Sequence, residues 1–594
     1  MRSVITKAFL TVIYMWFYSL PSLAGAASDS DNFYQLLDEH WQHSLQEQVW
    51  FRRDPDSFRM DGRLPSLGPE ARLRRHHYNE QVLSTLAKIE PAVLTPSEQV
   101  SYAVFSYERQ AERAAFAQLN HYFPLTNRTS WQSYFVNAPE NMSFLNKKDY
   151  DRYLLSLADY PRYNAENIAR MEEAVDRGLT HYCGSMQGFE NSISDSIVSD
   201  VTRSALYQPF QNMPESIAGD DRKHLRERGQ QIISEAVLPA FREFLEFYLE
   251  EYSEHCRQAP GIDSVEGGAD YYRYLVGFYT TTDLSPGQVH KLGLAEVERI
   301  RAEMEAVIAG VGFNGSFADF LTFLRSDPRF YTDTPEDLME KVSRIAKRMD
   351  GQLPRLFATL PRNTYDIKAV PTLIAERTTS AYYVPASGDD RTPGTYFINT
   401  SRLDSRPLYA MEALSFHEAV PGHHLQNAIA QEADIPAFRR YLNHSAFTEG
   451  WGLYSERLGL EVGFYSDPYS NFGRLAYEMW RACRLVVDTG IHAYGWSRQQ
   501  AIDYLADNTA LSVHEATAEI DRYITLPGQA LGYKVGEIKI RELRQRAEQT
   551  LAGDFDLRDF HDVLLRNGSL PIAVLEDQVN KYLLERMSSR EAEH

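Results

Sequence analysis

A histidine and a glutamate stand side by side in residues 417–424, which read HEAVPGHH. A neutral histidine nitrogen is a good zinc ligand, and a carboxylate next to it can accept a proton from an attacking water. In the familiar H-E-x-x-H arrangement the second histidine follows one helical turn later, where this chain has Pro421. The segment predicts a metal-dependent hydrolytic site with unusual spacing, in which His417 binds the metal and Glu418 is the general base.

The spacing of these histidines excludes a straight helix through the site. Six or seven residues rise by about 9–10 Å along an α-helix, which is too far for two histidine side chains to share one ion. Pro421 cannot donate a backbone hydrogen bond and Gly422 tolerates unusual dihedral angles, so we expect the helix to break there. The second ligand is then either His423 or His424, and the spacing leaves this choice open.

A third ligand is expected from a second helix that carries Glu449 and Glu456. Because these glutamates are two helical turns apart, they lie on the same face. Such a pair suits one metal ligand and one group that hydrogen-bonds to another ligand. Glu449 is the favoured ligand and Glu456 its competitor, although without the histidines both would be interpreted as solvated residues. We expect one zinc ion per chain, with manganese or cobalt as substitutes.

Helical patterns dominate the elements that must position this site. Residues 221–252 keep apolar side chains at three- and four-residue spacing, which predicts one long amphipathic helix. Capping sequences predict further helix starts after Ser285, Thr334 and Ser497. We therefore expect a mainly α-helical fold, built as a large two-lobed body around a cleft.

One short region favours β-structure. Residues 381–385 and 394–399 are rich in β-formers and flank a polar turn, which predicts a hairpin beside the metal-site helix. Pro385 indicates that one of its strands lies at an edge, and an edge strand can bind an extended peptide through its main chain. A purely structural hairpin fits the same residues equally well. The side chains that would contact a substrate there are Tyr382, Tyr383 and Tyr396.

The N-terminus has the order of an export signal. Two basic residues precede an apolar run and then small residues up to Ala26, as in a cleavable signal peptide over residues 1–26. No cysteine follows these small residues, so we do not expect a lipid anchor there. The mature chain is expected in the periplasm or outside the cell, without stable membrane insertion. We expect a helical N-terminal lobe over residues 27–280 and a catalytic lobe over residues 281–594.

Composition excludes several classes of protein. The 594 residues are 43% hydrophobic and 24% charged, which is ordinary for a globular protein with a large core. The formal net charge of −21 argues against a nucleic-acid partner. Cys183, Cys256 and Cys483 allow at most one disulfide and do not suggest a cysteine-based metal site. Nothing in the sequence predicts the oligomeric state.

The chain resembles a bacterial family known as domain of unknown function 885. Four motifs carry this resemblance: HExxPGHHLQ at 417–426, FTEGWxLY at 447–454, DTGxH at 488–492 and DRYxxxPGQALxYK at 521–534. That family looks distantly similar to helical gluzincin peptidases such as thimet oligopeptidase and angiotensin-converting enzyme. Aligning their Gly-His with Gly422-His423 implies that His423 is the second ligand. This chain has two extra residues before His423 compared with those peptidases, so His424 stays a possible second ligand.

The same resemblance implies a tyrosine or histidine that faces the scissile carbonyl. Zinc-dependent peptide hydrolysis needs such a donor for the oxyanion, besides the metal and the base. Tyr533 and His492 are the favoured donors and Tyr523 is a further candidate. Arg522 could bind a substrate carboxylate, or it could form a buried ion pair with Asp488 or Glu519.

Together these residues predict a zinc-dependent peptidase that acts on short peptides, as an exopeptidase or an oligopeptidase. Two other classes stay open. One is a metal-containing peptide-binding protein without catalysis, which the base at Glu418 argues against. The other is an amidohydrolase that acts on cell-wall peptides or another amide.

Overall fold

The structure is a computed structural model, and it describes residues 28–47, 62–142, 144–375, 378–386 and 393–593. The predicted signal peptide lies outside these residues. Helices dominate the chain and a single small sheet lies among the described residues, so the prediction of a mainly α-helical fold is confirmed. None of the described helices has the length and apolar character needed to cross a membrane.

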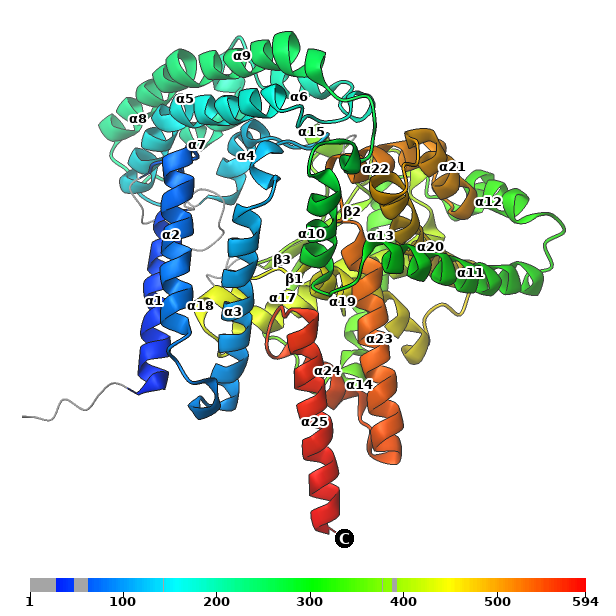
Figure 1. The fold of residues 1–594 in the computed structure, drawn as a ribbon. Coiled ribbons are helices and arrows are strands. Elements are labelled where there is room, and N and C mark those ends of the chain that lie inside the picture. The colour runs from blue at the N-terminus through cyan, green and yellow to red at the C-terminus, as the bar shows by residue number, and fades with distance from the viewer. Residues whose placement is uncertain (1–27, 48–61, 143, 376–377, 387–392, 594) are drawn as a thin grey trace, which may run out of the picture.

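The first helices of the chain form the upper and left part of the molecule in Figure 1. They are α1 (Asp29–Glu47), α2 (Pro69–Leu86), α3 (Pro96–Phe116), α4 (Trp131–Asn137), α5 (Lys147–Asp176), α6 (Phe189–Ser194), α7 (Gln208–Gln211), α8 (Gly219–Ile232) and α9 (Leu238–Phe247). Two π-helical segments, Ile233–Val237 and Tyr248–Tyr252, continue α8 and α9, so the long helix predicted over residues 221–252 is present.

The next helices along the chain lie within residues 268–375. They are α10 (Gly268–Thr280), α11 (Pro286–Gly310), α12 (Phe317–Ser326), α13 (Pro335–Asp350), α14 (Leu353–Leu356) and α15 (Thr372–Ala375). The side chain of Ser285 accepts a hydrogen bond from the N–H of Gln288 at the start of α11, and Thr334 caps α13 in the same way. The predicted helix starts are therefore confirmed, because each cap satisfies an otherwise unpaired backbone donor.

The remaining helices include the two that carry the histidine-containing segment, α16 and α17. They are α16 (Met411–Glu418), α17 (His423–Glu432), α18 (Ala437–Arg440), α19 (Ser445–Leu458), α20 (Pro468–Ala493), α21 (Arg498–Asn508), α22 (Val513–Thr525), α23 (Leu531–Leu551), α24 (Leu557–Leu565) and α25 (Ile572–Glu593). Helix α19 packs along α23, where Gly450 lies directly against Gly536. A side chain at either glycine would overlap the facing backbone, so the two helices can approach this closely only without one.

The sheet has three strands in the order β1-β3-β2. Strands β2 (Ala381–Val384) and β3 (Gly394–Ile398) are antiparallel and form the predicted hairpin, with β2 at an edge as Pro385 indicated. Strand β1 (Tyr365–Ala369) pairs in parallel with β3 and was not predicted. Its sequence, YDIKA, alternates charged with apolar residues over only five positions, which is too short to distinguish from a loop.

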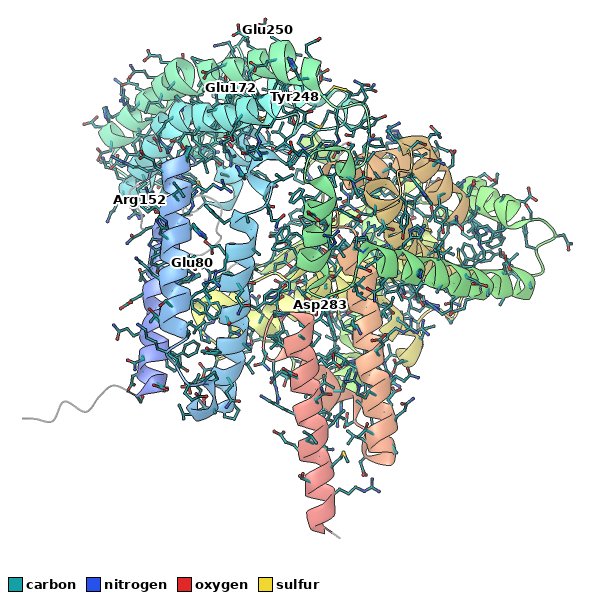
Figure 2. All side chains as sticks on the ribbon, viewed as in Figure 1. Glu80, Arg152, Glu172, Tyr248, Glu250 and Asp283 are labelled. Carbon is teal, nitrogen blue, oxygen red and sulfur yellow. A yellow bond between two sulfur atoms is a disulfide. The ribbon has the colours of Figure 1, made fainter. Side chains whose placement is uncertain are left out.

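Buried side chains form several cores that tie the helices together. One core lies within residues 64–252, and another, within residues 297–530, includes helices that flank the histidine segment. A smaller core joins α10 with α20 and α23, so helices on both sides of residue 280 share buried contacts. The outer surface is acidic in places, where Glu172, Glu250 and Asp283 are exposed (Figure 2). The predicted division into two lobes stays a prediction.

Candidate metal centre

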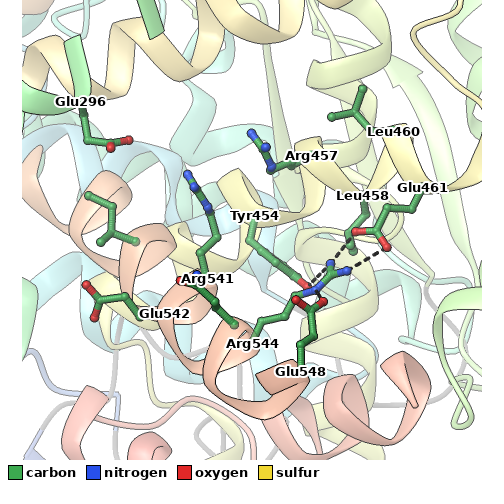
Figure 3. Close-up of a pocket in the computed structure, with 12 residues that line it drawn as sticks. Glu296, Tyr454, Arg457, Leu458, Leu460, Glu461, Arg541, Glu542, Arg544 and Glu548 are labelled. Atoms are coloured by element: carbon green, nitrogen blue, oxygen red, sulfur yellow. Dashed lines mark hydrogen bonds and ion pairs between the residues drawn. The ribbon is translucent and has the colours of Figure 1, made fainter. Parts of the chain in front are cut away.

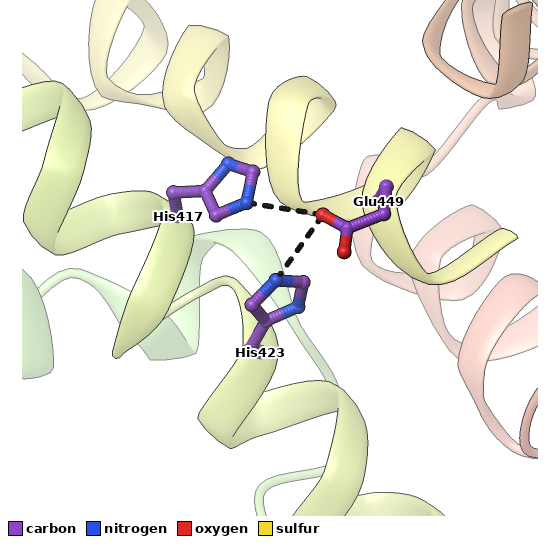
Figure 4. Close-up of side chains that lie close together, drawn as sticks. All are labelled: His417, His423 and Glu449. Carbon is purple, nitrogen blue, oxygen red and sulfur yellow. Dashed lines mark ion pairs between the residues drawn. The ribbon is translucent and has the colours of Figure 1, made fainter. Parts of the chain in front are cut away.

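Three side chains from separate helices converge on one point (Figure 4). Nε2 of His417 on α16 lies 3.5 Å from Oε2 of Glu449 on α19, and Nε2 of His423 on α17 lies 3.6 Å from the same oxygen. These distances exceed those of ordinary hydrogen bonds. They are close to the roughly 3.4 Å that separates two ligands of a tetrahedral zinc ion with bonds of about 2.1 Å. The three residues therefore fit a single zinc-sized ion.

The helix break that the spacing required is present between α16 and α17. Helix α16 ends at Glu418 and α17 begins at His423, and the backbone at Ala419 and Gly422 is far from helical, with ψ angles of −109° and −128°. A side chain at Gly422 would overlap the carbonyl oxygen of His417, so this turn requires glycine. The break folds the chain back and brings His423 next to His417.

Helix α19 holds the break in place and leaves room for the histidine rings. The indole N–H of Trp451 donates a hydrogen bond of 2.9 Å to the carbonyl oxygen of Pro421. Gly452 faces the ring of His417, and a side chain there would press on the ring nitrogens. Gly452 was not among the predicted site residues, although its position three residues after Glu449 placed it on the same helix face.

Glu456 lies behind His417 and is outside the three converging residues. Nδ1 of His417 donates a hydrogen bond of 2.8 Å to Oε1 of Glu456, which leaves Nε2 facing Glu449. Burial alone would lower the pKa of His417, but its contacts with Glu449 and Glu456 raise that pKa to about 9. A carboxylate that fixes the tautomer of a histidine ligand is the usual support for a metal site.

This arrangement predicts the effect of replacing Glu456 by Gln. We expect zinc affinity to fall by about 10–100-fold, because the glutamine keeps the size but loses the charge that supports His417. Competition with a chelating dye measures the affinity. Glu461→Gln is a matched control, since Glu461 follows α19 and pairs with Arg544 instead of a histidine. An unchanged affinity in the Glu456→Gln variant would contradict the assigned role.

His424 points away from the three converging residues. Its Nδ1 lies 3.0 Å from the hydroxyl of Tyr383, and its ring packs against Tyr365 on strand β1. Burial lowers the pKa of His424 to about 4, so its ring is neutral at ordinary pH. The structure thus favours His423 over His424, the choice that the spacing left open.

Glu418 is available as a proton acceptor. It is the last residue of α16, it is half-buried, and its charge contributes to the raised pKa of the adjacent His417. Within the described part of the chain its side chain makes no hydrogen bond or ion pair. A carboxylate with no protein partner beside a metal site can take up and release a proton.

Tyr533 on α23 is also brought to this site. Its ring lies 6.5 Å from the ring of His417 and is nearly parallel to it. Burial and the charge of Glu449 raise the pKa of Tyr533, so its hydroxyl keeps its proton and can donate a hydrogen bond. Of the donors proposed from the sequence, Tyr533 is the one whose ring lies beside that of His417.

Comparison with known proteins identifies the family. Residues 51–579 match the model of the family described as "Bacterial protein of unknown function (DUF885)". The chain belongs to this family. No curated protein matches this DUF885 chain. The DUF885 chain resembles the crystal structure of a candidate lipoprotein from Colwellia psychrerythraea. The sequence identity is 26% and the TM-score is 0.87, and the match covers 94% of this chain and 100% of that one.

A second solved structure shares the fold of this DUF885 chain. It is described as a candidate lipoprotein of unknown function from Shewanella oneidensis, and it has 18% sequence identity and a TM-score of 0.70. The match covers 93% of this chain and 99% of that one. The fold of the DUF885 chain therefore recurs over nearly its whole length in both solved structures.

His492 of the DUF885 chain is not an oxyanion donor, which corrects the prediction from sequence. It is fully buried, its Nδ1 accepts a hydrogen bond from the N–H of Ile262, and its Nε2 donates one to the carbonyl oxygen of Tyr523, both at 3.0 Å. Burial lowers the pKa of His492 to about 3. Because the backbone uses both ring nitrogens, His492 joins α20 to α22 and has no N–H left to donate to a substrate.

Tyr523 is likewise a structural residue in the DUF885 chain. Its hydroxyl accepts hydrogen bonds from the indole of Trp480 and from Nε of Arg484, and it donates one of 2.8 Å to Glu519. The catalytic role predicted for Tyr523 is therefore wrong, because no further donor remains on its hydroxyl. Arg522 forms the ion pair with Glu519 that was one of its two interpretations, and this pair and its bond to Gln529 leave two of its N–H groups unused.

The hairpin tyrosines of the DUF885 chain mainly support the fold. Tyr396 is fully buried, with its hydroxyl against Ser415, so a substrate cannot reach it, and its predicted role is wrong. Tyr383 contacts His424, and the ring of Tyr382 stacks on Phe397. The position of β2 still agrees with the peptide-binding hypothesis, because β2 is an edge strand in contact with α16.

Two other polar regions of the DUF885 chain do not compete with this centre. Glu296, Glu478 and Glu537 also converge, but the ammonium of Lys534 lies 2.8–3.0 Å from all three, and each glutamate has a further ion pair with Arg299, Arg474 or Arg541. A separate cavity of about 530 Å³ between α19 and α23 is lined by charged residues of both signs (Figure 3). Its lining includes none of the three converging residues.

Proposed function

We propose that this chain is a zinc-dependent hydrolase that cleaves peptide bonds in short peptides. The observation that carries the proposal is the convergence of His417, His423 and Glu449 beside the unpartnered carboxylate of Glu418. Two nitrogens and one oxygen with a position left for water are typical of catalytic zinc sites. The distant similarity of the family to gluzincin peptidases supports the same reaction.

The proposed chemistry assigns one task to each residue. A divalent ion held by His417, His423 and Glu449 would polarise the scissile carbonyl and make an attacking water more acidic. Glu418 accepts the proton of the attacking water and later passes it to the leaving amine. The hydroxyl of Tyr533 donates a hydrogen bond to the carbonyl oxygen as negative charge develops on it.

One feature of the fold supports a peptide as the substrate. Strand β2 is an edge strand that contacts α16, and an edge can pair with the main chain of an extended peptide. Glu418 has no evident role in a protein that only binds peptides, so catalysis is the better interpretation. Cell-wall peptides stay an alternative substrate because they contain comparable amide bonds.

We further propose that the protein is exported. The predicted signal peptide over residues 1–26 and the disulfide between Cys183 and Cys256 both support an oxidising compartment. The third cysteine, Cys483, is buried as a free thiol. The description of two similar structures as candidate lipoproteins agrees with export of this kind of chain.

A peptide library tests the proposed activity. The mature chain is incubated with peptides of mixed sequence, with and without a chelator, and the products are identified by mass spectrometry. We expect cleavage that the chelator stops and added zinc restores. Cleavage of muropeptides alone would favour the cell-wall amidase, and no cleavage by a folded, zinc-loaded sample would favour a binding protein.

A further inference from the structure

A cluster of three arginines surrounds a single glutamate next to the candidate metal centre. Glu519 lies 3.0 Å from Arg522, 3.4 Å from Arg484 and 3.3 Å from Arg128. Arg484 comes from α20, Arg522 and Glu519 from α22, and Arg128 from the segment before α4. We call Arg128, Arg484 and Arg522 the arginine cluster. One carboxylate cannot neutralise three guanidinium groups, so the cluster keeps an excess of positive charge.

Part of this excess charge is buried. The side chain of Arg484 is only 5% exposed, and its Nη1 has no hydrogen-bond partner among the described residues. Its other bonds go to the hydroxyl of Tyr523 and to Glu519. The guanidinium also packs on the rings of Trp480 and Tyr533, and an anion that reached its unpaired N–H would add a charged partner to these contacts.

Arg522 gives an anion access to this cluster. Its side chain is 16% exposed, and its bonds to Glu519 and Gln529 use only three of its five N–H groups. Two parallel N–H groups of a guanidinium match the two oxygens of a carboxylate, which makes arginine the preferred residue for this anion. Arg522 and Arg484 both donate to Oε2 of Glu519, so a carboxylate bound to Arg522 would lie close to both guanidinium groups.

The arginine cluster is one side chain away from the candidate metal centre. The ring of Tyr533 lies 4.3 Å from the guanidinium carbon of Arg484 on one side and 6.5 Å from the ring of His417 on the other. An extended peptide advances by about 3.5 Å per residue. Only a few residues can therefore lie between a carboxylate on the cluster and a bond that is cut at the metal.

We propose that the arginine cluster binds the C-terminal carboxylate of the substrate, so that the enzyme removes one to three residues from the C-terminus of a peptide. This inference rests on the proposed peptidase function and specifies its substrate. Tyr533 lies between the two sites and is positioned to contact the carbonyl of the cleaved bond. The internal bonds of long chains are poor substrates, because their carboxylate lies too far from the metal.

The test compares peptides that differ only at the C-terminus. A pool of N-acetylated hexapeptides of mixed sequence is prepared once as free acids and once as C-terminal amides, and cleavage is followed by mass spectrometry. We expect the free acids to be cleaved at least tenfold faster, with loss of their last one to three residues. Equal cleavage of both pools would overturn the inference and leave the peptidase function intact, whereas no cleavage of either would overturn both.

Binding separates the arginine cluster from catalysis. In the Glu418→Gln background, calorimetric titration with the two pools should give at least tenfold tighter binding of the acids. Adding Arg484→Met should remove most of this difference. Arg544→Met is the matched control, because Arg544 also bonds to a buried tyrosine hydroxyl and to a glutamate, but lines the separate cavity. An unchanged acid preference in the Arg484→Met variant, or an equal loss in the control, would contradict the proposal.

Discussion

Replacing Glu418 by Gln is expected to lower kcat by about 10²–10⁴-fold while the zinc stays bound. Glutamine has nearly the same size and polarity as glutamate, but it cannot accept the proton of the attacking water. Glu418 does not belong to the three converging residues, and it has no protein partner in the described chain whose loss would disturb the fold. Steady-state kinetics and metal analysis of the same preparation measure the two effects together.

Glu412→Gln is the matched control for this variant. Glu412 lies on the same helix, where it accepts a hydrogen bond from the N–H of Tyr465 and lies 3.7 Å from Arg348. We expect the control to keep most of its activity. A Glu418→Gln variant with full activity would exclude Glu418 as the base, and a variant that lost its zinc would leave its role in proton transfer unsupported.

Replacing His423 by Asn is expected to abolish zinc binding at ordinary zinc concentrations, whereas His424→Asn should keep it. His423 is one of the three proposed ligands, so its loss should cost more than the 10–100-fold expected for a supporting group such as Glu456. His424 instead contacts Tyr383 and Tyr365 on the sheet. Its replacement should lower stability without changing the metal content.

Two adjacent histidines make this comparison stringent. Both variants remove the same chemical group, and both positions lie in the first turn of α17. Metal analysis after dialysis gives the zinc content, and thermal denaturation gives the stability of each variant. Loss of zinc from the His424→Asn variant alone would show that the ring of His424 turns to the metal, and the assigned ligand set would be wrong.

Local sequence chemistry predicted much of this fold. Ser285, Thr334 and Ser497 cap helices because each offers a side-chain oxygen to an unpaired backbone N–H. The break at Pro421 and Gly422 was also predictable, because no straight helix can bring His417 and His423 together. These features depend on a few neighbouring residues, so a single sequence contains what is needed to infer them.

The direction in which each side chain points could not be predicted in the same way. His423 and His424 differ only in their direction after the break, and this direction depends on the dihedral angles at Ala419 and Gly422. Tyr396 belongs to a plausible binding hairpin, yet it faces Ser415 inside the fold. A strand pattern specifies alternation but not which face is buried.

Long-range packing explains the incorrect catalytic candidates. His492 and Tyr523 have residue types that suit an oxyanion donor, but both are fully buried among partners from other helices. The sequence does not show that the ring N–H of His492 and the hydroxyl of Tyr523 are already hydrogen-bonded, because this depends on the packing of α20 against α22. Tyr533 has a similar sequence context, and it differs because α23 turns its ring toward His417.

A zinc-edge anomalous diffraction map of crystals of the zinc-loaded protein would locate the metal itself. We expect one strong peak per chain, about 2.0–2.1 Å from Nε2 of His417, Nε2 of His423 and a carboxylate oxygen of Glu449. A peak bounded by His424, or a peak elsewhere with these three side chains bonded only to one another, would contradict this expectation.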